Sequence, residues 1–314
     1  MNENSGKFRL SRESPLFQLF VSLLIIAGVG MVLTLIFVLA GVFIFNSDLT
    51  VLDKAVNTLR ANDAGFMRYL LIMQDITLFI VPSIIIMNLL RPENSGRLTE
   101  AKVPGITEIG LVIILAFCIF PITSFTGQIN SAIRLPEGLK GLETWITEKE
   151  EKADNLIEMI IASRTLWSMM LNLATIAIMP AIGEELIFRG VFQKILGRLF
   201  RSDHIAIWVT AIIFSTIHFQ FYGFIPRLIL GLVFGYLFLW SGTLWLPVIA
   251  HFVNNAFPVI LAYIQGVETM SSPVDLPLWK QAAILPVPII VSLVILFYFR
   301  NKSKQAIGIM NKEY

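Results

Sequence analysis

Cysteine and histidine are scarce in this chain of 314 residues, which has one Cys and three His. The single cysteine, Cys118, cannot form an intramolecular disulfide, and thiolate metal sites and iron–sulfur clusters need more ligands than this inventory holds. Charge is scarce as well, since Asp, Glu, Lys and Arg make up 15% of the residues and the net charge is +2. Because no strong basic excess is available, we expect no nucleic-acid partner.

Apolar residues are correspondingly abundant, at 56% of the chain, which is above the usage of a typical soluble domain. A helix that crosses the hydrocarbon core of a bilayer needs ~20 apolar residues. The first such run, from Ser14 to Ser47, is longer than the apolar part of a cleavable signal peptide and is interpreted as a signal anchor. Seven further runs lie at roughly 66–90, 106–125, 166–200, 205–221, 224–240, 244–264 and 282–299. The predicted fold class is all-α: a polytopic integral membrane helical bundle of about eight transmembrane helices in a lipid bilayer.

Lysine and arginine collect at alternate connections between these runs. The basic segments are the N-terminal tail, residues 91–102, residues 194–201 and the C-terminal tail. Eight spans put all four segments on one side, and short cytoplasmic loops are the ones enriched in Lys and Arg. We therefore predict an integral, multi-pass membrane protein with both termini in the cytoplasm. The connections that fall on the other side are 46–65, 127–164, 222–223 and 265–280.

Two adjacent carboxylates and a guanidinium interrupt the fourth apolar run. Glu184, Glu185 and Arg189 lie just after Pro180 and Gly183. A charged side chain at bilayer depth costs at least ~2.5 kcal/mol, so such a group is a candidate functional site. Residues four apart share a helix face, which predicts an ion pair between Glu185 and Arg189, whereas Glu184 is turned by ~100°. We expect Glu184 to be presented to a cavity.

Further polar side chains follow on later apolar runs, each read as a helix. His218 comes four residues after Phe214, and His251 and Asn255 are four apart, so both of the latter project from one face. Any one of these residues could simply form an interhelical hydrogen bond, worth ~0.6 kcal/mol on average. As a set with Glu184 they have a chemical use, which is hydrolysis. A carboxylate and an imidazole can take a proton from water, and an imidazole and a carboxamide can hold an oxyanion.

The same side chains could instead hold a metal. Two histidines and one carboxylate are a catalytic zinc pattern, with Glu184, His218 and His251 as the ligands. The HExxH arrangement of soluble zinc proteases is missing, and no separate general base is obvious if Glu184 is a ligand. The residues alone leave the cofactor open between none and zinc.

The order and spacing of these residues resemble a known family, the CPBP intramembrane proteases, also called Abi or type II CAAX prenyl proteases. The matching motifs are EExxxR at Glu184, Glu185 and Arg189, FxxxH at Phe214 and His218, and HxxxN at His251 and Asn255. Gly190 after Arg189 also fits the form EExxxRG. The motifs span about a quarter of the chain, and the first half is not matched beyond being apolar.

This resemblance implies an endopeptidase whose site lies within the membrane and is reached from the cytoplasmic side. By position, Glu184 and His218 would activate water, and His251 and Asn255 would stabilise the oxyanion. Glu185 and Arg189 would support them. The family is customarily named a metalloprotease family, but asparagine is a poor zinc ligand and a useful oxyanion donor, which favours a metal-free, glutamate-dependent mechanism. The substrate would be a peptide or protein at the membrane, with a C-terminal CAAX-like sequence as one possibility.

The predicted organisation has three parts. Residues 1–165 hold N-terminal transmembrane helices and an acidic connector at about 127–164, whose charged run from Lys149 to Asp154 predicts a solvated helix. Residues 166–264 form the catalytic helical core, and residues 265–314 form a last transmembrane helix with a basic tail. Asp75, deep in the first half, is expected to bond between helices in preference to lining the cavity.

Two rival functions stay open. One is a non-catalytic membrane scaffold or bacteriocin-immunity partner with the same fold. The other is a proton-coupled transporter with Glu184 and His218 as a relay, which is weakened because the chain has no internal repeat of broken helices. The sequence gives no prediction of oligomeric state.

Overall fold

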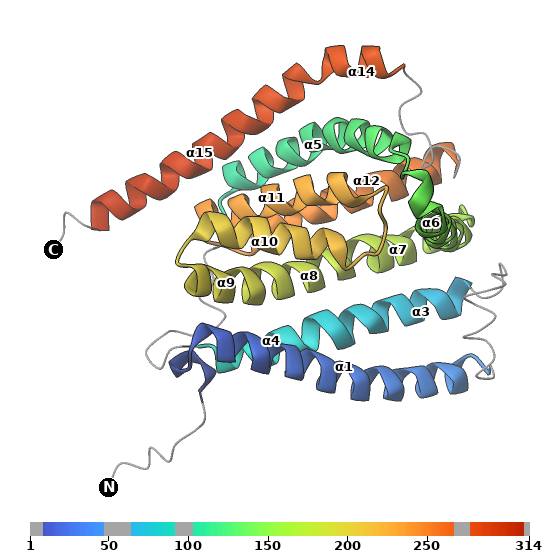
Figure 1. Cartoon of the computed structure of the whole chain (residues 1–314), viewed down its shortest axis with the longest axis horizontal. Coiled ribbons are helices and arrows are strands. Elements are labelled where there is room, and N and C mark those ends of the chain that lie inside the picture. The colour runs from blue at the N-terminus through green and yellow to red at the C-terminus, as the bar shows by residue number, and fades with distance from the viewer. Residues whose placement is uncertain (1–8, 47–63, 92–102, 267–276, 311–314) are drawn as a thin grey trace, which may run out of the picture.

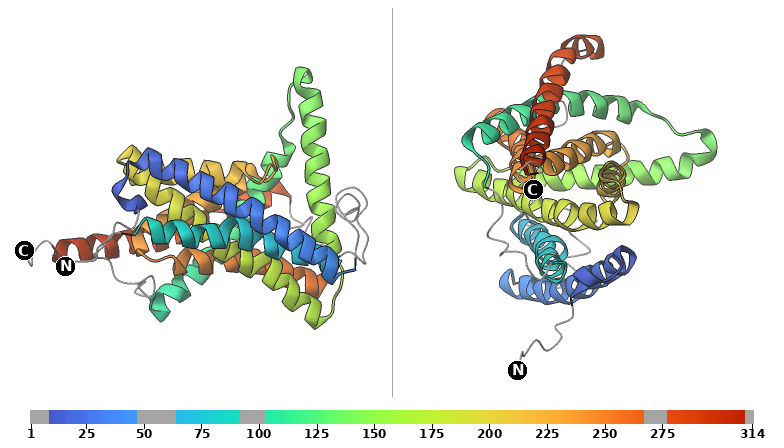
Figure 2. Two further views of the ribbon diagram at one scale, coloured as in Figure 1. Left: turned by 90° about the horizontal axis from the view of Figure 1, so that it is seen from below. Right: turned by 90° about the vertical axis from the view of Figure 1, so that its left-hand side faces the viewer.

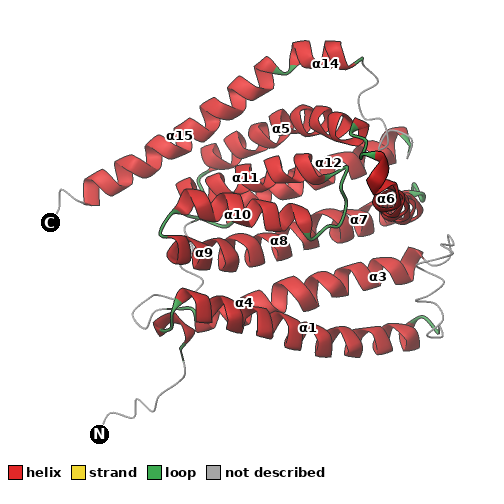
Figure 3. Ribbon diagram, viewed as in Figure 1, coloured by secondary structure: helices red, strands yellow, loops and turns green. Residues whose placement is uncertain are grey.

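The computed structural model describes residues 9–46, 64–91, 103–266 and 277–310. Every regular element in these residues is a helix (Figure 1, Figure 3). Seven helical segments among them are long and apolar enough to cross a membrane. The predicted polytopic helical membrane fold is thereby confirmed. Much of the predicted basic connection 91–102 and parts of both terminal tails lie outside the described residues.

The first half contains three of these spans and one long connector helix. The second span is a single helical segment in which one π-helical turn separates two α-helices, and the short turns η1 (Leu10–Arg12) and η5 (Glu137–Leu139) lie outside the spans. The bounds are α1 Pro15–Ile44, α3 Ala64–Gln74, η3 Asp75–Ile80, α4 Val81–Leu89, α5 Ile106–Ala132 and α6 Lys140–Ile161.

The second half begins with the segment Leu166–Phe200, in which two π-helical turns interrupt the α-helix. Such turns are rare and recur at functional sites. The bounds are α7 Leu166–Asn172, η6 Leu173–Ile178, α8 Met179–Glu185, η7 Leu186–Phe192 and α9 Gln193–Phe200. The remaining helices are α10 Asp203–Thr216, α11 Phe224–Ser241, α12 Trp245–Gln265, α14 Leu278–Ile284 and α15 Pro286–Met310.

The spans lie side by side, and successive spans run in opposite directions when the shorter helix α10 is included among them (Figure 1). One apolar core joins α5, α11, α12 and α15, around Leu115, Phe234 and Phe299, and a second joins α4, η7 and α10, around Ile86 and Phe188. Both described ends of the chain lie at one end of the bundle, whereas α6 projects at the opposite end (Figure 2). The two ends of the bundle therefore carry different parts of the chain.

The fifth predicted span is shorter than expected, and this changes the setting of His218. Helix α10 has 14 residues and ends at Thr216, so His218 lies in the following turn and the prediction that it lies on a helix is wrong. The Phe214 carbonyl, which the next helical N–H would use, accepts a hydrogen bond from the His218 ring Nδ1 at 2.7 Å. Phe219 then takes a left-handed backbone conformation with φ of 51° and turns the chain.

Close packing of α10 on α11 depends on Gly231. A Cβ atom at this position would lie 2.9 Å from the Cβ and 3.0 Å from the Cα of Ala211. We expect Gly231→Ala to lower the free energy of unfolding by ~1–3 kcal/mol, because the helices must separate to admit the methyl group. Thermal unfolding of the detergent-solubilised protein measures this effect.

Gly110 in α5 provides the matched control, since a Cβ there would have no described heavy atom within 4 Å. Gly110→Ala should leave stability unchanged or raise it, because alanine is the better helix former. Equal unfolding temperatures for the two variants would contradict the proposed contact.

Candidate active site

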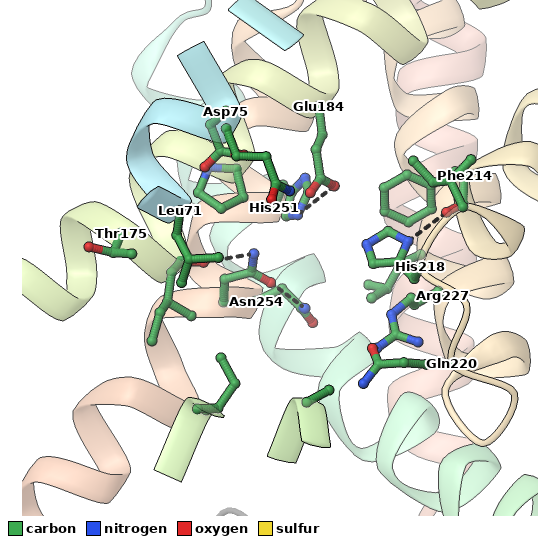
Figure 4. A pocket seen from close by; sticks show the side chains of 18 of the residues that line it. Leu71, Asp75, Thr175, Glu184, Phe214, His218, Gln220, Arg227, His251 and Asn254 are labelled. Carbon is green, nitrogen blue, oxygen red and sulfur yellow. Dashed lines mark hydrogen bonds and ion pairs between the residues drawn. The ribbon is translucent and has the colours of Figure 1, made fainter. Parts of the chain in front are cut away.

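The polar side chains singled out in the sequence meet at one cavity of about 650 Å³. It lies among η3, η6, α8, α12, the turn after α10, and α6 (Figure 4). Glu184, His218, His251 and Asn255 all line it. Asp75 lines it too, from η3, so this carboxylate lies at the cavity and not only between helices.

Glu184 and His251 are the facing pair. The Glu184 Oε2 atom lies 3.8 Å from His251 Nε2, which is too long for a direct hydrogen bond. This oxygen is buried and has no hydrogen-bond partner among the described residues. A buried carboxylate oxygen without a partner is costly, so its position at a cavity wall suits a water molecule or a substrate group.

Glu185 is directed to the other side of the helix and holds two groups at once. Its Oε1 atom lies 2.9 Å from Arg189 Nη1 and 2.9 Å from His251 Nδ1. The ion pair that the helical spacing predicts is therefore present. The contact with His251 is one that sequence reasoning missed, because the two residues are 66 positions apart and no local pattern joins them.

Arg189 is fully enclosed at 0% exposure, as is Glu185. Its Nη2 atom donates to the Gly231 carbonyl at 2.9 Å. The guanidinium carbon also lies 5.3 Å from the Phe214 ring centre and 5.5 Å from that of Phe234. Aromatic faces attract a cation, so the phenylalanine of the FxxxH motif helps to hold this charge in the protein interior.

His218 has a defined tautomer. A carbonyl oxygen can only accept, so the hydrogen bond from Nδ1 to Phe214 means that Nδ1 carries the proton. In a neutral imidazole the remaining nitrogen, Nε2, then has a free lone pair. The turn after α10 thus supplies the cavity with a hydrogen-bond acceptor.

Asn255 is held less tightly. Its Nδ2 atom donates to the Ile176 carbonyl at 3.3 Å, and its Oδ1 accepts from Asn254 at 3.3 Å. Ile176 belongs to the π-helical turn η6. These long bonds position the carboxamide at the cavity wall and leave its second N–H available to another acceptor.

Helix α6 forms part of the cavity wall, which the sequence did not indicate. Lys149, Leu156 and Ile157 line the cavity. Glu150 is partly buried, and its Oε1 accepts a hydrogen bond from the backbone N–H of Tyr222 at 2.8 Å. Burial raises the pKa of Glu150, although this hydrogen bond opposes the shift. The expected helix is present, but the expectation that it is solvated is wrong on this face, because α6 packs on the turn that carries His218.

The residues do not fit the zinc alternative. Within the described ranges, no group of three or more His, Cys, Asp or Glu side chains has an arrangement that could hold a metal ion. Glu184 and His251 approach each other at 3.8 Å, whereas the hydrogen bond that His218 forms in the described structure is to the Phe214 carbonyl. The proposed ligand set of Glu184, His218 and His251 is not supported, and no catalytic step is derived through a metal.

Taken together, the fold and the cavity define a polytopic membrane protein with a carboxylate and two histidines gathered between its helices. Residues 165–257 match the family model described as type II CAAX prenyl endopeptidase Rce1-like. The resemblance to the CPBP family predicted from the three motifs is confirmed over this segment. The match supports a CAAX-type intramembrane protease.

One curated relative is the uncharacterized protein YpbD of Bacillus subtilis (strain 168). It is 31% identical over 85 residues, which cover 26% of this chain and 40% of YpbD. The similarity thus spans less than half of that protein. No solved structure matches the chain.

The position of the cavity bears on two predictions from the sequence: that both termini are cytoplasmic, and that the site is reached from the cytoplasm. The cavity reaches the surface at Lys149, which is exposed, and is bordered by α6 and the turn at 217–220. Both segments lie at the end of the bundle opposite to the described chain ends (Figure 1). Cytoplasmic termini and a site reached from the cytoplasm, as the family resemblance implies, are therefore incompatible.

The buried ion pair of Glu185 with Arg189 can be tested through the stability of an Arg189→Met variant. Removing one partner leaves the Glu185 carboxylate without its cation, which costs ~3–5 kcal/mol for a buried pair. We expect a large fall in the thermal unfolding temperature of the purified protein. Arg198→Met, which removes an exposed arginine from the nearby helix α9, should change it little. Similar effects of the two changes would show that the buried pair has no special importance.

Proposed function

We propose that this protein is an intramembrane endopeptidase that hydrolyses a peptide bond of a membrane-associated peptide or protein. The observation that carries the proposal is the buried Glu184 oxygen, which faces the cavity without a hydrogen-bond partner among the described residues. The family match over residues 165–257 supports the same activity.

Glu184 acts as the general base in this proposal. A water molecule about 2.8 Å from Glu184 Oε2 could also contact His251 Nε2, because the two atoms are 3.8 Å apart. His218 offers its Nε2 lone pair to the same cavity and helps to orient the water. The water oxygen attacks the peptide carbonyl carbon as Glu184 takes its proton.

His251 and Asn255 stabilise the oxyanion that forms. The Nδ1 atom of His251 donates to Glu185, so the imidazolium form of His251 would carry its second proton on Nε2. Its Nε2–H and the free N–H of Asn255 are then available to the oxyanion. Glu184 returns its proton to the amide nitrogen as the C–N bond breaks.

The substrate is proposed from the character of the cavity. Leu71, Phe79 and Val259 line it alongside the polar groups, and its volume of about 650 Å³ suits a short apolar segment of peptide. A membrane-associated protein with an apolar C-terminal sequence, of the CAAX-like kind, fits this description. No lining residue identifies a prenyl group.

Glu184→Gln tests the base. Glutamine keeps the size and one acceptor oxygen but cannot take a proton, so hydrolysis should fall ~100-fold to 10,000-fold. The full chain in lipid nanodiscs is incubated with a mixture of apolar peptides in ¹⁸O-water, and mass spectrometry detects labelled new C-termini. Glu151→Gln, an exposed change on α6, is the control. Undiminished hydrolysis by Glu184→Gln, or none by the wild type, would refute the proposal.

The proposed orientation follows from the basic segments. We infer cytoplasmic termini, so that the cavity opens on the opposite side of the membrane, towards α6. In a Cys118→Ser background, an impermeant maleimide should label Glu151→Cys in intact cells and Lys304→Cys only after lysis. The reverse pattern would mean that the site is reached from the cytoplasm.

A further inference from the structure

A second cavity, of about 580 Å³, lies between the end of α4 and α9, away from the candidate active site. Three basic side chains line it: Arg91, which follows α4, and Lys194 and Arg198 of α9. Met87 and Leu90 add apolar surface. This part of α4 and α9 lies at the end of the bundle that carries both described chain ends (Figure 1, Figure 2).

Basic segments that are far apart in the sequence meet at this cavity. Lys194 and Arg198 are four apart and share one face of α9. Arg91 comes from a different connection, and Arg9 of the N-terminal tail donates from Nη1 to the Arg91 carbonyl at 3.4 Å. The positive-inside rule requires only that such segments lie on one side of the membrane, and not that they meet. Their convergence on one cavity therefore indicates a use beyond orientation.

The charges of Lys194 and Arg198 are not neutralised within the described ranges. Neither residue forms an ion pair there, and the charge that acts on Lys194 is the like charge of Arg198. Lys194 Nζ lies 5.5 Å from the Phe238 ring centre, a contact that attracts a cation but supplies no negative charge. Asp203 also lines the cavity, but it lies in the first turn of α10, where the helix end favours its charge. An anion in contact with both cations would relieve their repulsion.

The lining of the cavity indicates which anion it suits. Guanidinium and ammonium groups are the usual binders of phosphate. The apolar side chains of Met87 and Leu90 can in addition contact a hydrocarbon chain. We infer a cytoplasmic position for this end of the bundle, and the cytoplasmic leaflet is rich in anionic lipids. We propose that this cavity binds the phosphate group of an anionic phospholipid through Lys194 and Arg198. This inference does not depend on the proposed peptidase function.

Native mass spectrometry of the full chain in detergent tests the preference. The protein is titrated with a phosphatidylglycerol and, separately, with a phosphatidylcholine that has the same acyl chains. The wild type should bind the phosphatidylglycerol about 10-fold to 30-fold more tightly, because each Lys or Arg near an anionic headgroup contributes about fivefold. The double variant Lys194→Gln, Arg198→Gln should lose most of this preference.

The matched control is the double variant Arg300→Gln, Lys304→Gln. These residues are also basic, exposed and four apart on one helix. They lie towards the C-terminus of α15, which is at the same end of the bundle (Figure 1), but neither lines the cavity. The control should keep the full preference. An equal loss in both double variants would overturn the inference, because the overall charge of this end would then explain binding. A wild type without any preference would overturn it even if Lys194→Gln, Arg198→Gln folds poorly.

Competition distinguishes a lipid from a small soluble phosphate. Inorganic phosphate and glycerol 3-phosphate are each added in excess to the protein with bound phosphatidylglycerol. Retention of the lipid supports a phospholipid ligand held by both its headgroup and its chains. Displacement by either soluble compound would support a phosphate site but reject the phospholipid as its specific ligand. Oleate, an anionic lipid without phosphate, should bind more weakly than phosphatidylglycerol, and equal binding would refute recognition of phosphate.

Discussion

The buried guanidinium of Arg189 is the interaction on which the site depends. It contacts four residues from three parts of the chain: Glu185 beside it, Gly231 and Phe234 of α11, and Phe214 of α10. Because Glu185 also contacts His251, the same charge fixes the orientation of an imidazole on α12. The motifs are thus physically one unit, in which a cation that would be very costly alone is compensated by Glu185, the Gly231 carbonyl and two aromatic rings.

This arrangement leaves the two adjacent glutamates with different environments. Glu185 Oε1 contacts a cation and an imidazole at 2.9 Å, whereas Glu184 has only the 3.8 Å approach of its Oε2 atom to His251 Nε2; the Oε2 atom of each glutamate is buried without a hydrogen-bond partner in the described structure. The seven residues of α8 lie between two π-helical turns, η6 and η7. One of them offers the Ile176 carbonyl to Asn255, so the irregular helix also positions the carboxamide.

Features that depend only on helix geometry could be predicted from the sequence. Apolar runs predicted the membrane spans, and the four-residue spacing predicted the ion pair of Glu185 with Arg189. The contact of Glu185 with His251 could not be predicted, since it depends on how distant helices pack. The same holds for α6, whose charged sequence favours solvent but whose Glu150 finds the Tyr222 N–H. The position of His218 outside a helix could not be predicted either. Its own ring Nδ1 atom replaces the next backbone N–H as the donor to the Phe214 carbonyl, and α10 ends early. The division of the chain at residues 165 and 265 stays a prediction.

The two arginines near the site have different surroundings. Arg189 is fully buried and paired with Glu185, whereas Arg227 lines the cavity, donates to Gln220 and is close enough to Glu150, Glu184 and Asp154 for their charges to act on it. In Figure 4, His218 lies between Arg227 and the facing pair of Glu184 and His251. One arginine therefore holds the structure of the site together, and the other forms part of the cavity wall.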